Sequence, residues 1–260
     1  MAEEYELMKK ALITGGAGGL GQALTKQLQA FGWHVIILDV SSQGLKSTEQ
    51  LEVHLCDLTD KEARSKVVQQ VLSQHPKLDL VIYNAGVTQI GSFDQIDMES
   101  HRKLFEINYF SAVALAIQLA PAIRAAKGCH LAISSVAGFA PLYHRTSYSA
   151  SKHALEGFFK SLRSEEKLHG VDVLIAAPSF VATNISKGRE GSTGFQRPGS
   201  ASDAKDAMGP EEAAQEILKG YEKKRSMIPV GRIAKLAWRL NRFFPDFYQS
   251  LMEKQISGKD

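Results

Sequence analysis

Short apolar runs alternate with longer segments of helical periodicity along most of the chain. The apolar runs read ALIT, HVIILD, VHLC, LDLVIYNAG, HLAISS and VDVLIAAPS. Each run is apolar over nearly its whole length, which is typical of strands in a parallel sheet that helices cover on both faces. Segments such as 20–32 and 61–75 repeat apolar residues at the spacing of a helix face. Strands that alternate with helices predict an α/β fold with a parallel sheet.

The predicted fold is a single doubly wound Rossmann domain over residues 1–260, with about seven parallel strands in a central sheet and helices on both faces. A chain of 260 residues fits one large α/β domain better than two. The stretch 184–210 departs from the pattern because it is rich in Gly, Ser and charge. It is too long for a plain connection, so we expect a mobile lid or a disordered insertion. Pro210, followed by two acidic residues, favours a helix start.

Composition and charge exclude several classes of protein. With 44% hydrophobic and 23% charged residues, the chain resembles soluble globular proteins. Its formal charge of +3 arises from 31 basic and 28 acidic residues that are mostly interspersed, so we expect no nucleic-acid partner. Cys56 and Cys129 lie far apart with no Cys/His cluster beside them. We therefore expect neither a disulfide framework nor a metal site.

The chain start and the apolar runs bear on localisation. The first ten residues, MAEEYELMKK, are acidic where a secretory signal has a basic segment followed by an apolar one. No apolar run reaches the roughly 18 uninterrupted residues of a membrane span. The closest, 110–123, is interrupted by Gln118 and Pro121. We therefore expect a cytoplasmic protein.

A glycine-rich turn, TGGAGGLG, follows the first apolar run and precedes a helical pattern that begins at Leu20. This is the setting of a dinucleotide-binding turn. Gly15 permits the tight turn, Gly19 lets the backbone approach a pyrophosphate, and Gly21 lets the helix pack close to the strand. Free N–H groups at the helix start face the phosphates. An ordinary strand-to-helix turn is the alternative interpretation of the glycines taken alone.

The second run, HVIILD, ends in Asp39, about twenty residues beyond the glycines, where this fingerprint has an acid that binds the adenosine ribose. A simple turn residue is the alternative. A carboxylate at this point repels a 2′-phosphate. Neither Gly18 nor residues 40–43 supply the Arg or Lys that could neutralise one. We therefore predict NAD as the cofactor in preference to NADP.

Two further motifs carry groups suited to proton transfer. The run HLAISS ends with Ser134 and Ser135, and ligands bind at the carboxyl ends of parallel strands. In YSASK, Tyr148 and Lys152 are four residues apart, which places them on one face of a helix. Taken alone, such a pair usually means a solvated lysine beside a half-buried tyrosine.

Together these motifs resemble the short-chain dehydrogenase/reductase family over roughly the first 185 residues. The matching residues occur in family order: Thr14-Gly15-x-x-x-Gly19-x-Gly21, Asp57 in CDLTD, Asn84-Ala85-Gly86, Asn108 in INYF, Ser135, Tyr148-x-x-x-Lys152, and Pro178 with Thr183 in PSFVAT. Their joint occurrence is far more specific than any one of them. The chain departs from the family at Ser179, where a glycine usually follows the proline.

The resemblance implies roles for the catalytic residues. Tyr148 is expected to be the general acid/base and Ser135 to hold the substrate oxygen. Lys152 is expected to bind the nicotinamide ribose, and Asn108 to keep a water in a proton relay. A phenol titrates at roughly 10 in isolation, and a nearby ammonium together with the charge of an oxidised nicotinamide would lower the pKa of Tyr148 toward the operating pH.

The resemblance also implies cofactor contacts along the strand ends. Gly18 and Leu20 belong to the phosphate-binding turn, and Tyr148 and Lys152 also face the cofactor. The further contacts are Asp57 and Leu58 beside the adenine, Asn84, Ala85 and Gly86 at the floor, and Pro178, Val181 and Thr183 near the nicotinamide.

The expected function is hydride transfer between NAD and a secondary alcohol or ketone, the activity of an alcohol dehydrogenase or carbonyl reductase. Phe180 and the aromatic tail favour a lipophilic substrate. Three alternatives stay open. They are an NADP-dependent carbonyl or 3-oxoacyl reductase of the same fold, a sugar-nucleotide epimerase or dehydratase, and a non-catalytic nucleotide-sensing protein.

The segment 231–255 predicts basic amphipathic helices interrupted at Pro245. One face carries Ile233, Leu236, Ala237, Leu240 and Phe244, while Arg232, Lys235, Arg239 and Arg242 lie largely elsewhere. Such a helix can cover the substrate pocket, contact another subunit or dock on a membrane surface. The resemblance further implies a homodimer or homotetramer that pairs through faces around 110–123 and 148–162.

Overall fold

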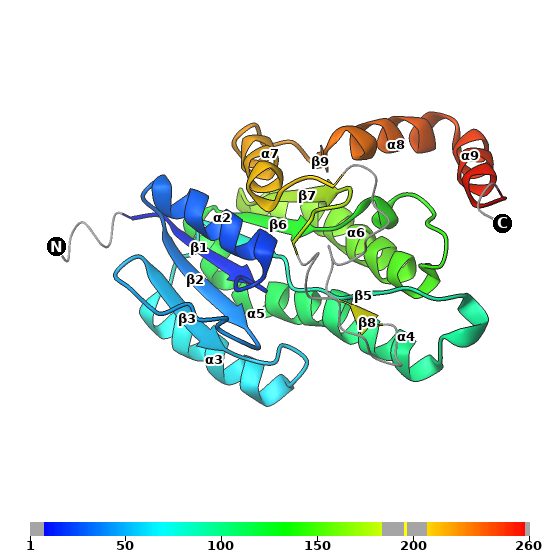
Figure 1. The fold of residues 1–260 in the computed structure, drawn as a ribbon. Helices are drawn as coiled ribbons and strands as arrows, with labels where there is room; N and C mark the ends of the chain where they lie inside the picture. Colours follow the sequence, from blue (N-terminus) through cyan, green and yellow to red (C-terminus); the bar gives the residue numbers. More distant parts are fainter. Residues whose placement is uncertain (1–7, 184–194, 197–206, 258–260) are drawn as a thin grey trace.

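A seven-stranded sheet runs through the centre of the molecule (Figure 1). The computed structural model describes residues 8–183, 195–196 and 207–257. The strands follow the order β3-β2-β1-β4-β6-β7-β9, and each neighbouring pair is parallel. Their bounds are β1 Lys10–Thr14, β2 His34–Asp39, β3 Leu51–Leu55, β4 Leu80–Tyr83, β6 Cys129–Ile133, β7 Asp172–Pro178 and β9 Met227–Val230. The predicted Rossmann-like α/β domain is confirmed, although β9 was not among the predicted runs.

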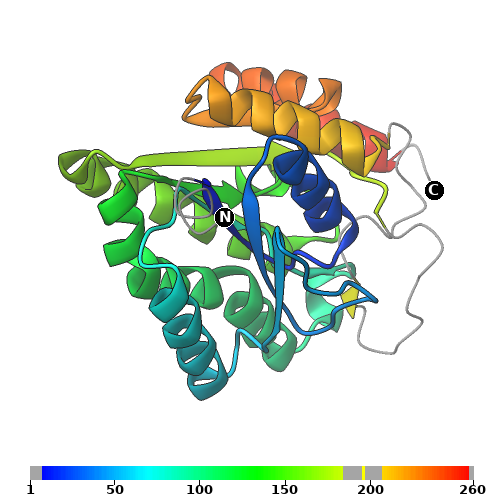
Figure 2. The same ribbon diagram turned by 90° about the vertical axis from the view of Figure 1, so that its left-hand side faces the viewer.

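Helices cover both faces of the sheet, which explains why its strands are apolar throughout. On one face lie α2 (Gly19–Ala30) and α7 (Pro210–Glu222). On the other lie α3 (Lys61–Gln74), α5 (Ser111–Ala126) and α6 (Thr146–Glu166). Figure 2 shows these two helical layers with the sheet between them. Neighbouring residues of one strand, such as Leu12 and Ile13, therefore join separate hydrophobic clusters.

The chain order reverses between β1 and β4, because β2 and β3 lie on one side of β1 and the later strands on the other. In open α/β sheets, ligands bind at the carboxyl ends of the strands beside such a switch point. Of the predicted site, the glycine-rich turn follows β1, Asn84 follows β4, and Ser135 follows β6. The topology thus assembles these segments at one end of the sheet.

One long helix packs on the α3 and α6 face of the sheet and departs from regular α-helical geometry near its middle. It consists of α4 (Met98–Phe105), a π-helical turn over Glu106–Phe110, and α5. By length and composition, Met98–Ala126 is apolar enough to span a membrane, with 39% of its most apolar window buried. Core helices of soluble proteins meet the same criteria, so this helix alone does not establish a membrane protein.

The C-terminal part adds β9 and two further helices, α8 (Arg232–Phe243) and α9 (Pro245–Ser257). The predicted helix start at Pro210 and the interruption at Pro245 are both confirmed. Of the predicted lid 184–210, the structure describes 195–196 and 207–210. Within it, β8 (Phe195–Gln196) pairs antiparallel with β5 (Thr88–Gln89). The lid prediction otherwise lies outside the described residues.

Candidate active site

The glycine-rich turn packs tightly between β1 and α2. Gly15 has a φ of +62°, and a Cβ added there would lie 2.9 Å from the Cα of Ala85. A Cβ on Gly21 would lie 2.3 Å from the carbonyl oxygen of Gly15, so close packing of helix and turn requires glycine. The helix begins at Gly19 with Gly18 as its N-cap, and no side chain in the described part caps it. Its first N–H groups suit an anionic ligand such as a phosphate.

Asp39 stands at the carboxyl end of β2 beside this turn. Its Oδ2 accepts a hydrogen bond from the backbone N–H of Ala17 over 3.0 Å. Its Oδ1 accepts one from the N–H of Ser41 over 3.2 Å. The carboxylate is thus held against the glycine-rich turn, where a dinucleotide fingerprint has its ribose-binding acid.

The Asn84 side chain braces the turn from the side of β4. Its Nδ2 donates to the carbonyl oxygens of Thr14 and Gly15 over 3.1 and 2.9 Å. The Thr14 hydroxyl in turn accepts from the N–H groups of Asn84 and Ala85, each over 3.0 Å. The sequence analysis did not assign this role to Thr14, although the residue lies within the glycine motif. The hydrogen bonds fix the end of β1 to the end of β4.

Tyr148 and Lys152 lie one turn apart on α6, and they are only 7% and 4% exposed. The Tyr148 hydroxyl lies close enough to the hydroxyl of Ser135, which follows β6, for this hydroxyl to lower the Tyr148 pKa in part. Nζ of Lys152 donates to the carbonyl oxygen of Ile133 over 2.9 Å and lies 6.0 Å from the centroid of the Tyr148 ring. The pair is therefore buried beside a strand end, unlike the solvated lysine usual for this spacing.

Asn108 lies in the π-helical turn and points into the same region. Its Oδ1 accepts from the N–H of Val87 over 2.8 Å, and its Nδ2 donates to the Val87 carbonyl over 2.9 Å. Nδ2 also donates to the hydroxyl of Ser151 over 3.0 Å. A Cβ on Gly86 would lie 3.2 Å from Oδ1 of Asn108 and 3.5 Å from Nζ of Lys152. The lack of a side chain at Gly86 thus lets both polar groups approach the backbone closely.

Burial dominates the titration of the tyrosine and the lysine. It raises the pKa of Tyr148, and the hydrogen bond with Ser135 and the positive charge of Arg145 offset this only in part. Burial lowers the pKa of Lys152 to about 8, against a smaller opposite effect of the Glu156 carboxylate. The protein's own groups therefore shift the phenol pKa upward, in the direction opposite to the expected one. Any lowering requires positive charge from outside the chain, such as an oxidised nicotinamide.

The predicted adenine contacts follow the edge strand β3. Asp57 is exposed, and its Oδ1 accepts from the N–H and the hydroxyl of Thr59 over 2.9 and 2.7 Å. Leu58 is buried, and its carbonyl oxygen accepts a hydrogen bond from Arg64. These contacts give the turn after β3 a defined shape.

Beyond β7, the chain returns to the glycine-rich turn. A Cβ on Gly19 would lie 2.7 Å from Cβ of Thr183, so Thr183 packs directly on the start of α2. Val181 accepts from the N–H of Thr183 over 2.9 Å. The N–H of Ser179 donates a hydrogen bond to β9 and so continues the sheet. Gly231 leaves room for the Ser179 side chain, because a Cβ on Gly231 would lie 2.6 Å from the Ser179 hydroxyl. The missing family glycine after Pro178 is thus accommodated by a glycine opposite.

A buried carboxylate behind the site escaped the sequence analysis. Glu156 is 1% exposed and lies one turn beyond Lys152 on α6. It accepts hydrogen bonds from the Ser134 hydroxyl over 2.8 Å and from Lys160 over 2.6 Å. Gly138 provides the space, because a Cβ there would lie 2.5 Å from Oε1 of Glu156. Glu156 follows Lys152 by four residues, so the sequence already places this carboxylate on the same helix face as the lysine.

Comparisons with known proteins agree with this geometry. The family model described as short chain dehydrogenase matches residues 9–192. A dehydrogenase/reductase SDR family member 7B from Xenopus laevis is 30% identical, covering 95% of this chain and 82% of that protein. A crystal structure of a short-chain dehydrogenase from Streptomyces avermitilis has a TM-score of 0.81 at 27% identity, covering 97% of this chain and 99% of that one.

A second solved structure shares the fold at lower identity. It is a short chain dehydrogenase from Burkholderia cenocepacia in complex with NADP, with a TM-score of 0.81 at 21% identity, covering 94% of this chain and 97% of that one. The chain belongs to the short-chain dehydrogenase/reductase family. It is therefore an oxidoreductase with a Rossmann-type nucleotide-binding fold.

Proposed function

We propose that this protein transfers a hydride between a nicotinamide dinucleotide and the carbon of a secondary alcohol or ketone. The observation that carries the proposal is the burial of Tyr148 and Lys152 against Ser135 at the carboxyl end of β6. When bound, the nicotinamide ring supplies the hydride donor or acceptor. The protein's own residues bind and orient the substrate and move the proton.

Tyr148 exchanges a proton with the substrate oxygen, and Ser135 holds that oxygen. The Ser135 hydroxyl faces the Tyr148 hydroxyl closely enough to affect its pKa, so a substrate oxygen between them would contact both. Because burial raises the pKa of Tyr148, the phenol is protonated at neutral pH and is ready to donate to a carbonyl. In the direction of alcohol oxidation, positive charge near the phenol favours the phenolate that accepts the proton.

Lys152 supplies fixed positive charge and hydrogen-bond donors. An ammonium has three donors, of which one is directed to the Ile133 carbonyl, so others can reach a ribose hydroxyl. The amide of Asn108 is largely occupied by Val87 and Ser151. The relay water is then held by the remaining lone pair of Oδ1 or by the Asn108 backbone carbonyl.

Substitution of the phenol tests this mechanism. Tyr148→Phe removes one hydroxyl and keeps the ring, so we expect turnover to be abolished and cofactor affinity to be nearly unchanged. Turnover is followed by NADH absorbance with a panel of secondary alcohols, and affinity by NADH titration. The matched control is Tyr143→Phe, which changes a tyrosine that is 55% exposed. A Tyr148→Phe enzyme that retains more than about one-hundredth of the activity contradicts the mechanism.

We propose NAD as the preferred cofactor. The support is the Asp39 carboxylate, held against the glycine-rich turn by the Ala17 N–H, together with the lack of Arg or Lys at positions 40–43. Removing the carboxylate by Asp39→Ala is expected to shift the ratio of the two affinities toward NADP by about tenfold, the effect of 1.4 kcal/mol. Tighter binding of NADP by the unchanged protein, with no shift in Asp39→Ala, would refute this account.

The same assays separate the alternative functions. An NADP-dependent carbonyl or 3-oxoacyl reductase would show the opposite cofactor preference and turn over a ketone or a 3-oxoacyl thioester. An epimerase or dehydratase would consume a sugar nucleotide without net release of NADH. A nucleotide-sensing protein would bind the dinucleotide without turnover, although its catalytic residues would then have no reason to lie together.

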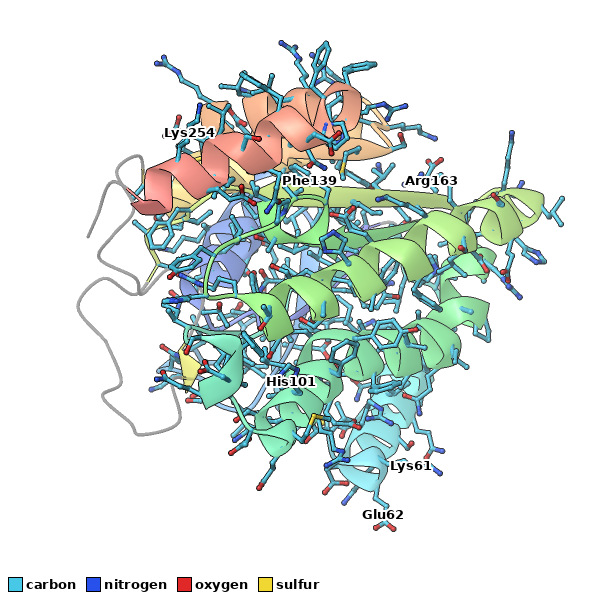
Figure 3. The ribbon with its side chains drawn as sticks, turned by 90° about the vertical axis from the view of Figure 1, so that its right-hand side faces the viewer. Lys61, Glu62, His101, Phe139, Arg163 and Lys254 are labelled. Carbon is cyan, nitrogen blue, oxygen red and sulfur yellow. The ribbon has the colours of Figure 1, made fainter. Side chains whose placement is uncertain are left out.

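The C-terminal helices favour a lipophilic substrate. On α8, Ala234 and Ala237 pack against Val136 and Ala140 of the segment that follows Ser135. Figure 3 shows Phe139 beneath the C-terminal helices, on the side that faces α6. The buried apolar face of α8 therefore covers the segment next to the catalytic serine. Measured kcat/KM for alcohols of increasing chain length is expected to rise, and a preference for small polar alcohols would contradict the proposal.

We also propose that α8 contacts an anionic membrane surface. Three large side chains of the expected apolar face stay in solvent, since Ile233, Leu236 and Phe244 are 49%, 59% and 62% exposed. Arg232 and Arg239 lie exposed beside this stripe. The helix also borders a pocket of about 490 Å³ whose lining includes Lys160, Arg163, Arg225 and Arg242. Exposed apolar and basic groups on one helix match the pattern of interfacial helices.

Vesicle binding tests this contact. The protein is expected to co-sediment with vesicles that contain anionic phospholipid, less so at high salt, and Leu236→Glu is expected to abolish the binding. The matched control is Leu168→Glu, at a leucine that is 88% exposed on another part of the molecule. Absence of vesicle binding, together with a change of oligomeric state in Leu236→Glu, would show that the stripe is a subunit contact.

We further propose a homodimer or homotetramer. Phe110 and Ile117 are 48% and 67% exposed on the long helix, which leaves an apolar face available to a second copy. Light scattering of the purified protein gives its mass. We expect Ile117→Glu to reduce the oligomer to a smaller species, and a monomeric wild type would refute the proposal.

A further inference from the structure

A cluster of histidines with one glutamate lies near the amino ends of two strands, away from the glycine-rich turn. His34 is the first residue of β2, Glu52 lies in the edge strand β3, and His75 is the C-cap of α3. These elements lie together at one side of the sheet (Figure 1). His34 and His75 are each 1% exposed. Three segments that are distant in sequence thus bring imidazole and carboxylate groups to one point.

The ligand atoms of the three side chains converge. Nε2 of His34 and Nε2 of His75 lie 2.9 and 2.8 Å from the same Oε1 of Glu52. All three atoms lie within 4.8 Å of one another. His54, two residues beyond Glu52 on β3, places its Nε2 3.2 Å from Oε2 of the same carboxylate. One carboxylate therefore faces three imidazoles.

The hydrogen-bond partners of His34 point to a cation. Its Nδ1 lies 3.1 Å from the backbone carbonyl oxygen of Glu49, and its Nε2 faces Oε1 of Glu52. Both partners are acceptors, and a neutral imidazole has a single N–H. A proton on Nδ1 satisfies the carbonyl and leaves a lone pair on Nε2 that faces the carboxylate. This arrangement is favourable when a positive charge lies between Nε2 and the carboxylate, as in metal sites where the outer nitrogen donates to a carbonyl.

We propose that His34, Glu52 and His75 bind one Zn²⁺ or a chemically similar divalent transition-metal ion. Two imidazole nitrogens and a carboxylate oxygen are ligands that zinc prefers over magnesium or calcium. Ligands about 2.05 Å from a tetrahedral zinc lie about 3.3 Å apart. The observed 2.8 and 2.9 Å contacts require Glu52 to retract by about 0.5 Å to match that separation. Its side chain is 20% exposed and has room to move.

The site would act as a clamp on the edge of the sheet. β3 is the edge strand and pairs with β2 alone among the strands of the described sheet. A metal ion that joins β2, β3 and the end of α3 would hold this edge in place. At the opposite ends of the same two strands, Asp39 is the last residue of β2 and Asp57 follows β3 by two residues. The clamp would thereby stabilise the part of the sheet that supports the proposed adenosine contacts.

The sequence predicts no metal site, because its Cys and His residues form no cluster along the chain. The ligands are separated by 18 and 23 residues along the chain. They come together through the parallel pairing of β2 with β3, which places Glu52 opposite Ile36, and through the return of α3 to the start of the sheet. Single histidines next to strands carry no such signal in the sequence.

Metal titration tests the proposal directly. Tag-free protein is dialysed against a chelator and titrated with Zn²⁺ by calorimetry, and separately with Co²⁺, whose visible absorption reports tetrahedral coordination. We expect one equivalent of Zn²⁺ to bind and to raise Tm. Glu52→Gln and His75→Gln each remove a direct ligand, so we expect affinity losses above the roughly 10–100-fold typical of outer-shell changes.

The controls distinguish a metal site from a hydrogen-bond network. His153→Gln, at an exposed histidine of α6, is expected to leave Zn²⁺ affinity unchanged. The metal-free wild type is compared by circular dichroism with each variant, and the wild-type titration decides the question even if a variant does not fold. Absence of saturable one-to-one binding to the wild type overturns the proposal. Binding that persists unchanged in both Glu52→Gln and His75→Gln overturns it as well.

Discussion

Replacing the buried lysine of the proposed active site should make the protein more stable and inactive. Lys152 is 4% exposed, and burial lowers its pKa from 10.5 to about 8. Below pH 8 the folded protein holds a charged ammonium in a site that disfavours the charge. The unfolded chain holds the same ammonium in water at no such cost. Lys152→Met keeps most of the side-chain length and removes this penalty.

The size of the effect follows from the shift in pKa. One pKa unit corresponds to 1.36 kcal/mol, so a shift of about 2.5 units costs about 3 kcal/mol at pH 7. Methionine forfeits the hydrogen bond to the Ile133 carbonyl, worth about 1 kcal/mol. We therefore expect Lys152→Met to raise the free energy of unfolding at pH 7 by about 2 kcal/mol.

The pH dependence identifies the cause. The penalty is fully present below pH 8 and is relieved as the pH rises from about 8 to 10.5, where the unfolded lysine also loses its proton. At pH 9.5 the penalty falls to about 40% of its value at pH 7, so the advantage of Lys152→Met should shrink by about 2 kcal/mol. Urea denaturation at both pH values measures this difference. Lys26→Met, at an exposed lysine of α2, is the control and should show no such trend.

Two results would refute this reasoning. A Lys152→Met protein that is less stable than wild type at pH 7 would show that the ammonium is stabilised in the fold. A stability difference that stays constant between pH 7 and 9.5 would show that the lysine does not titrate in this range. Either result would show that burial does not lower the pKa of Lys152 to about 8.

Two other substitutions test the packing that the structure describes. Gly21→Ala brings a Cβ to 2.3 Å from the carbonyl oxygen of Gly15. We therefore expect it to lower the free energy of unfolding by about 1–3 kcal/mol and to weaken dinucleotide binding in a titration. The control is Gly157→Ala, where a Cβ meets no atom within 4 Å and which should stabilise the protein. Arg124→Met leaves the buried Glu166 carboxylate without its ion-pair partner at 2.6 Å. We expect urea denaturation to show a loss of about 2 kcal/mol in the free energy of unfolding. This is less than the loss for a fully buried pair, because Arg124 is 41% exposed. Equal stability of the two glycine variants, or no loss in Arg124→Met, would contradict these assignments.

Much of the fold could be predicted because it depends on local patterns. Strands that are buried on both faces must be apolar throughout, which is why runs such as HVIILD were visible in the sequence. The break between α8 and α9 was visible because Pro245 cannot continue the hydrogen bonding of a preceding helix but fits the first turn of the next one. The short strand β9 was missed, since Met227–Val230 includes a proline and has few apolar neighbours in sequence.

The site was predictable to the extent that its residues occur in motifs. Tyr148 and Lys152 share a helix face by spacing, and Gly21 is required by contact with its own turn. The direction of the Tyr148 pKa shift was not predictable, because it depends on burial by residues from several elements. The exposure of Leu236 on α8 was also hidden, since it depends on the small residues Ala234 and Ala237 forming the buried face instead. The roles of the site residues stay predictions until the variants are measured.

The π-helical turn at Glu106–Phe110 divides the long helix into two halves, α4 and α5, whose side chains are rotated about the helix axis relative to those of one continuous α-helix. An α-helix advances by about 100° per residue, so the extra residue in this turn sets how α4 is rotated relative to α5. Deleting one residue here would allow a regular helix. The deletion would, however, either rotate the fully buried Leu104 of α4 away from the core or rotate Asn108 away from Val87. Changes of length in this turn should therefore be tolerated less well than changes of side chain. The proposed active site therefore depends on the residue count of a helix that supplies Asn108 and packs Leu104 in one cluster with Tyr148.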